Sequence, residues 1–233
     1  MNNNPFTIEG TVFVDCPTSF EGKVVVPAGI TEIGEKALMF CDKVNEVELP
    51  ETLEGIGLCA FHGCNFKEIA IPEGCKSIAA SAFLTCLSLK EIDLPDGMLV
   101  LEEALFCGCE NLERAGLPDS IRIIREEAFA GCASLRTVKL PSNLEKLEAM
   151  AFSGCRSLRE VTIPDSCRQL CYGVFEDCTS LESITLPRSM AELHDYVFEG
   201  CTNLRHIKIP IHTVINNHAL AGCRDTITIE RYL

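Results

Sequence analysis

One pattern of apolar and polar positions repeats every 23 residues along most of the chain. A representative copy covers residues 118–140, and its last three residues alternate apolar, polar, apolar, which predicts a short strand with one buried face. The next copy begins with Pro141, which lacks the N–H that a continuing ladder needs and therefore ends the strand. In the middle of the copy, residues 124–132 have apolar side chains at i, i+4, i+5 and i+8, which predicts a short helix or 3₁₀ turn ended by Gly131.

Three columns of residues keep this register. Prolines recur at intervals of 23 residues, with one interval of 22, and a cysteine follows most of them 14 residues later, with a leucine or phenylalanine three residues before it. The columns are Pro27, Pro50, Pro72, Pro95, Pro118, Pro141, Pro164, Pro187 and Pro210; Cys41, Cys64, Cys86, Cys109, Cys132, Cys155, Cys178, Cys201 and Cys223; and Leu38, Phe61, Phe83, Phe106, Phe129, Phe152, Phe175, Phe198 and Leu220. One copy is too small to bury both of its halves, so neighbouring copies are expected to stack into a solenoid. Strands one repeat apart would then pair in parallel at about 4.8 Å, and nine of them would give a sheet roughly 40 Å long.

The repeated pattern reads Pro-x-x-Ile-x-x-Ile-x-x-x-Ala-Phe-x-Gly-Cys-x-x-Leu-x-x-Ile-x-Leu over about residues 24–223. It resembles the BspA-like branch of the leucine-rich repeat family. The resemblance implies an α/β fold class, a curved leucine-rich repeat solenoid with one parallel β-sheet on the concave face and short helices or 3₁₀ turns on the convex side. It also implies a binding module and not an enzyme. Many family members are secreted or anchored at the cell surface.

We expect residues 1–233 to form a single leucine-rich repeat domain. Residues 1–26 lack the repeat and are expected to form an N-terminal cap, as a hairpin or a first turn. Residues 27–209 carry the regular repeats. Residues 210–233 lose the register and are expected to form a degenerate last repeat that serves as the C-terminal cap.

The charge and the apolar pattern limit the possible partners. A net charge of −14 argues against binding nucleic acid and against adsorption to anionic membranes, because both need a basic surface. The chain begins without the basic and apolar segments of a signal peptide, and no apolar run approaches the roughly 20 residues of a membrane span. We therefore expect a cytoplasmic protein, or a secreted or surface protein if a leader has been removed.

The fifteen cysteines raise the possibilities of disulfides and of metal binding. Side chains of one column point in parallel, whereas a disulfide needs converging Cβ vectors, so we interpret the column as free, buried thiols. No second pair of ligands completes a four-ligand zinc site around the cysteine pairs 107/109 and 167/171. The sequence also lacks the phosphate-binding, dinucleotide-binding and serine-nucleophile motifs, and we predict no metal, no cofactor and no catalytic residue.

The outward positions of the predicted strands carry the candidate binding residues. Acidic side chains form a stripe in the second to fourth repeats, and the same surface then becomes polar and mildly basic. The candidates on the concave face are Glu46, Glu48, Glu68, Glu91, Asp93, Arg114, Lys139, Glu160, Thr162, Thr185, His206 and Lys208. Like charges on adjacent strands repel, so the stripe is either a solvated face that opposes aggregation or a docking surface for a basic partner. The absence of tryptophan, and of tyrosine from this face, argues against docking.

The functional hypothesis is a non-catalytic, monomeric protein interaction module that binds a protein or peptide, with a basic surface, on its concave sheet. Two alternatives stay open. One is an inhibitor or immunity-type protein that neutralises a basic toxin or nuclease. The other is a cell-surface, adhesin-like protein, which would require that a leader peptide was trimmed.

Overall fold

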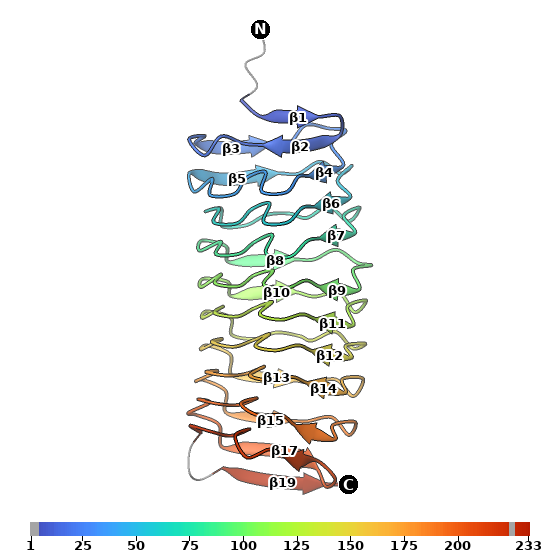
Figure 1. The fold of residues 1–233 in the computed structure, drawn as a ribbon, viewed down its shortest axis with the longest axis vertical. Coiled ribbons are helices and arrows are strands. Elements are labelled where there is room, and N and C mark those ends of the chain that lie inside the picture. The colour runs from blue at the N-terminus through green and yellow to red at the C-terminus, as the bar shows by residue number, and fades with distance from the viewer. Residues whose placement is uncertain (1–4, 224–226) are drawn as a thin grey trace.

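The computed structural model of the chain describes residues 5–223 and 227–233, and these residues form a stack of similar turns along one axis (Figure 1). Most turns pass through two rows of short strands, and both rows extend along the stack with interruptions. The core lies between the two rows, and almost every member of it is apolar. This is the parallel-sheet solenoid that the repeat predicts.

The first row contains the strands at the proline column together with β19 after the last proline, and we call its solvent-exposed side the strand face. Its strands are β3 (Gly22–Val25), β5 (Val44–Glu48), β8 (Glu91–Asp93), β10 (Arg114–Gly116), β13 (Glu160–Thr162), β15 (Ser183–Thr185), β17 (His206–Pro210) and β19 (Thr228–Tyr232). All of their pairings are parallel, for example Ser183 with His206. Single bridges join Glu68 to Glu91 and Thr137 to Glu160, so the row is interrupted at the third and sixth repeats.

The second row was not predicted. It contains β2 (Val12–Asp15), β4 (Glu32–Ile33), β6 (Gly55–Ile56), β7 (Ser77–Ile78), β9 (Val100–Leu101), β11 (Ile123–Ile124), β12 (Lys146–Leu147), β14 (Gln169–Leu170), β16 (Glu192–Leu193) and β18 (Val214–Ile215). These short strands pair in parallel, and each except β18 buries one residue, such as Ile124 or Leu147, in the core. The expectation of a single sheet was therefore wrong.

The short helices predicted for the convex side are also wrong, because the described residues contain no helix. Glu127 and Gly131 both have positive φ, 55° and 72°, and a left-handed residue at every fourth position cannot belong to an α-helix. Backbone N–H groups in this segment instead bond the next turn, as Phe129 does to the carbonyl oxygen of Ala151 at 2.8 Å. The segment is thus a series of tight turns held by bonds between repeats.

The phenylalanine column forms the centre of the core. Seven rings are fully buried and stack along the axis, with neighbouring centroids 5.1–5.8 Å apart and ring planes within 22° of parallel. The cysteine column lies beside it. The thiol of Cys155 donates to the carbonyl oxygen of Phe129 on the preceding turn, at 3.3 Å, and burial raises the pKa of this thiol. Each buried column thiol from Cys64 to Cys201 makes the equivalent bond, which explains a cysteine at this position.

The two ends of the stack differ. At the N-terminal end, β1 (Thr7–Glu9) pairs with β2 in antiparallel fashion. The ring of Phe6 packs on those of Phe13 and Phe20, with ring centroids 5.3 and 5.0 Å apart. At the other end β19 is the last strand, and Ile229, which occupies a core position, is 41% exposed. Residues 1–4 and 224–226 of the two expected cap segments lie outside the described residues, and the division into caps and regular repeats stays a prediction.

Candidate functional site

Six of the predicted site residues line one groove on the strand face, with a volume of about 710 Å³. They are Glu46, Glu48, Glu68, Glu91, Asp93 and Arg114, and they come from β5, the third repeat, β8 and β10. All six are solvent-exposed because the alternation along each strand turns them away from the core. The groove therefore runs along the axis of the stack, across four successive turns.

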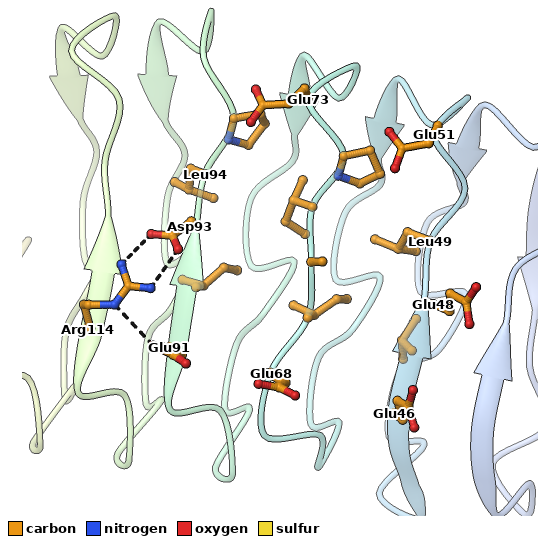
Figure 2. Close-up of a pocket in the computed structure, with 17 residues that line it drawn as sticks. Glu46, Glu48, Leu49, Glu51, Glu68, Glu73, Glu91, Asp93, Leu94 and Arg114 are labelled. Carbon is orange, nitrogen blue, oxygen red and sulfur yellow. Dashed lines mark hydrogen bonds and ion pairs between the residues drawn. The ribbon is translucent and has the colours of Figure 1, made fainter.

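Two further acids and an apolar strip complete the groove. Glu51 and Glu73 directly follow the proline column, and neither was predicted as a site residue. Figure 2 shows their carboxylates at one margin of the groove and those of Glu46 and Glu68 at the other, with the side chain of Leu49 between the margins. The signal was available in the sequence, because an acid follows the proline in these neighbouring repeats. The strand alternation, which selected the candidates, does not reach past the proline.

Arg114 holds two of the predicted acids at one end of the groove. Its Nη1 and Nη2 lie 2.5 and 2.7 Å from the two carboxylate oxygens of Asp93, and its Nε lies 3.3 Å from Oε2 of Glu91 (Figure 2). Hydrogen bonding to Arg114 lowers the pKa of Asp93. Gly116 makes room for this arrangement, because a Cβ there would lie 2.0 Å from the Asp93 carboxylate.

Lys23 has the same role at the other end of the groove. Its Nζ lies 2.7 Å from a carboxylate oxygen of Glu46 and 2.8 Å from one of Glu48, and these bonds raise the pKa of Lys23. The like-charge repulsion expected within the stripe is therefore offset at both ends. In the centre, no cation of the described residues lies within ion-pair distance of Glu68. Each end thus has one cation for two carboxylates, and Glu68 in the middle has none beside it in the described part of the chain.

The other predicted residues do not belong to this groove. Glu160 lines a second hollow, together with Arg136 and Arg159. Thr162, Thr185 and Lys208 line a third, together with Glu230 and Tyr232. The hydroxyl of Tyr232 donates to the carbonyl oxygen of Leu186, and Lys208 forms an ion pair with Glu230. Lys139 and His206 are exposed on the strand face and line none of the three. The predicted surface is thus divided into separate sites.

Two properties of the structure bear on metal binding and on membrane insertion. Across residues 5–223 and 227–233, no three histidine, cysteine or acidic side chains are placed to hold a metal ion together. In the same ranges no helix has the length and apolar character needed to cross a membrane.

The comparisons with known proteins decide the family. The profile of the BspA type leucine rich repeat region matches residues 7–132 and 100–227, in six copies. The chain belongs to the BspA-type leucine-rich repeat family. No catalytic family is indicated, and the leucine-rich repeat fold is typically a non-enzymatic scaffold. No curated protein matched this BspA-type chain.

Solved structures give the same fold for this BspA-type chain. A leucine-rich repeat protein from Bacteroides ovatus is 25% identical, with a TM-score of 0.52 over 98% of this chain and 91% of that one. The T. pallidum leucine rich repeat protein is 24% identical, with a TM-score of 0.56 over 94% and 87% of the two chains. The pneumococcal vaccine antigen PcpA is 18% identical, with a TM-score of 0.56 over 91% and 68%. The last two likenesses bear on the fold alone.

Proposed function

We propose that this BspA-type chain is a non-catalytic, monomeric interaction module that binds a basic, extended segment of a protein partner in the acidic groove. The observation that carries the proposal is the arrangement in Figure 2, where an apolar strip with half-buried Leu49 runs between carboxylates at both margins. Half-buried Ile71 also lines the groove. Lysine and arginine side chains have apolar stems and charged ends, so they can cover such a strip while reaching carboxylates on either side.

The dimensions of the groove support an extended ligand. Successive turns are about 4.8 Å apart, and an extended peptide rises about 3.3 Å per residue, so a segment of five or six residues spans the four turns. Its side chains alternate in direction, which suits a segment of alternating basic and apolar residues. Glu68 is the first carboxylate such a segment would pair with, because Lys23 and Arg114 already form ion pairs with the carboxylates at the ends of the groove.

The test uses a fluorescent hexapeptide of alternating lysine and leucine, with binding measured by anisotropy. Glu68→Lys is expected to weaken binding by about tenfold or more, since it replaces an attraction in the centre of the groove by a repulsion. The matched control is Glu126→Lys, which makes the same charge change at an exposed residue outside the groove.

The salt dependence provides the second readout. Binding is expected to weaken between about 0.05 and about 0.3 M NaCl, because salt screens exposed charges. The proposal is wrong if Glu126→Lys weakens binding as much as Glu68→Lys does, because the peptide would then respond only to the net charge of −14. Binding that is insensitive to both salt and Glu68→Lys would also contradict it. The same pair of variants then serves as bait and control in a pull-down from the native lysate.

A further inference from the structure

The second hollow on the strand face has a chemistry opposite to that of the acidic groove. It has a volume of about 450 Å³ and is lined by Arg136, Thr137, Ser157, Arg159, Glu160 and Ser180. These residues come from three successive turns, and the backbone N–H of Arg159 donates to the carbonyl oxygen of Arg136 at 3.3 Å. The two arginines therefore stand in the same column, one turn or about 4.8 Å apart along the backbone.

The two arginines form no ion pair with any of the residues that the structure describes. No carboxylate of the described residues lies within ion-pair distance of Arg136 or Arg159, although Glu160 lines the same hollow. By contrast, Arg114, Arg122 and Arg125 each pair with a carboxylate one turn away. Two guanidinium groups one turn apart, neither with an ion-pair partner in the described part of the chain, repel each other, and a bound anion would offset this repulsion. In a chain with a net charge of −14, this is a local site for negative charge.

The remaining lining residues indicate which anion fits. Thr137, Ser157 and Ser180 line the same hollow, and each has a hydroxyl group that can donate to an anion, as the two guanidinium groups can. A phosphoryl group has three acceptor oxygens and carries nearly two negative charges, and guanidinium groups bind it in bidentate fashion. A carboxylate has only two oxygens and one charge. The donor set therefore matches a phosphoryl group better than an acidic side chain.

We propose that this hollow, the Arg136–Arg159 pocket, binds the phosphoryl group of a phosphorylated peptide segment. The acidic net charge opposes approach to nucleic acid and to anionic membranes, whereas a short peptide presents few other phosphates. Glu160 at the edge of the pocket selects for a basic residue beside the phosphorylated one. Recognition of phosphorylated motifs by clustered arginines is an established mode of peptide binding. The pocket is separate from the acidic groove, and the two sites share no lining residue.

The test compares short peptides that contain the sequence Lys-phosphoserine, Lys-Ser or Lys-Glu between glycines, with binding measured by calorimetry. The phosphorylated peptide is expected to bind, and Arg136→Gln and Arg159→Gln are each expected to weaken it by about tenfold or more, the usual loss for a hydrogen bond to a charged group. Arg159→Lys keeps the charge but loses the bidentate fork, so an intermediate loss is expected. The matched control is Arg168→Gln, at an exposed arginine that does not line the pocket. Far-ultraviolet circular dichroism checks that each variant is folded.

Three results would overturn the proposal. The first is equal binding of the Lys-Glu peptide, which would show no selection for a phosphoryl group. The second is a loss of affinity in Arg168→Gln as large as in the two pocket variants, which would show that the peptide responds only to the net charge of the protein. The third is binding of inorganic phosphate without binding of the phosphorylated peptide. Glu68→Lys is expected to leave the affinity for the phosphorylated peptide at least as high, so a failure of the acidic groove and a failure of this pocket can be distinguished.

Discussion

Truncation of one ring in the phenylalanine column tests how the stack is held together. The side chain of Phe129 is fully buried, and its ring lies 5.3 Å from that of Phe106 and 5.1 Å from that of Phe152. Phe129→Ala is expected to lower the free energy of unfolding by about 3–5 kcal/mol, the usual cost for a buried aromatic side chain. We expect the upper part of this range because the neighbouring turns are tied by backbone bonds, such as Phe129 N–H to Ala151, and cannot collapse into the cavity.

Two further variants make the reasoning specific. Phe198 has a ring neighbour on one side only, Phe175 at 5.8 Å, and Leu220 takes the next place in the column. Phe198→Ala should therefore cost less than Phe129→Ala by about one aromatic pair, or about 0.5–1.5 kcal/mol. Phe40→Ala is the surface control, because this ring is 54% exposed, and it should cost less than about 1 kcal/mol.

The assay is urea unfolding followed by circular dichroism, with the slope of the transition compared among the variants. An unchanged slope allows the midpoints to be read as stabilities, whereas a reduced slope would indicate that the turns no longer unfold together. The assignment of the column to the core is refuted if Phe129→Ala unfolds within about 1 kcal/mol of the parent protein, a margin well below the cost of a buried aromatic truncation.

Three other predictions follow from the same structure. A reducing agent should leave the unfolding midpoint unchanged, because the cysteines are free thiols. Iodoacetamide at mildly alkaline pH should label half-buried Cys107 before Cys155, because burial raises the pKa of both thiols and Cys155 is in addition fully buried; early labelling of Cys155 would contradict this. Glu127→Gly should stabilise the protein by about 1 kcal/mol, because it removes the strain of a positive φ at a residue with a side chain. Glu126→Gly should destabilise the protein, because Glu126 does not have a positive φ. Equal effects of the two variants in urea unfolding would refute backbone strain at Glu127. Arg114→Met should change stability by less than about 1 kcal/mol, because the ion pairs are exposed, and should raise the pKa of Asp93 in an NMR titration. Arg114 lowers the pKa of Asp93 in the folded protein, so the small stabilisation by this pair is fully present above the pKa that Asp93 has in the unfolded chain. It is lost as the pH falls through the pKa of Asp93 in the folded protein. The same titration of Asp93 in the parent protein and in Arg114→Met would contradict the pairing.

The repeat could be predicted from the sequence because each column residue occupies the same environment in every turn. The strands of the first row are visible as an alternation before each proline. The second row was missed because it uses only two residues per turn, such as Ile123–Ile124, too few to produce an alternation. The helix prediction failed because four-residue spacing also fits turns that are left-handed at every fourth position. One sign of the left-handed turn was available in the sequence, because Gly173 occupies the same position of the repeat as Glu127, two repeats later.

The groove was partly predictable for a related reason. Outward strand positions follow from the alternation, and they gave six of the residues that line it. The distribution of charge within it depends on side-chain geometry. Lys23 bridges two acids on the next turn, and Arg114 reaches Asp93 only because Gly116 leaves the space open. Neither arrangement follows from the order of residues alone.

Because the two ends of the stack differ, the molecule should unfold from one particular end when it is stretched. The first turn is closed by an aromatic hairpin, while the last exposes Ile229, so tension applied between the termini should detach the C-terminal turn first. Each detached turn leaves a new end of the same kind, because a turn contacts only its neighbours. The chain should then lengthen in regular steps, each releasing 23 residues, or roughly 80 Å of extended chain. Such a stack would act as an extensible tether that yields one turn at a time.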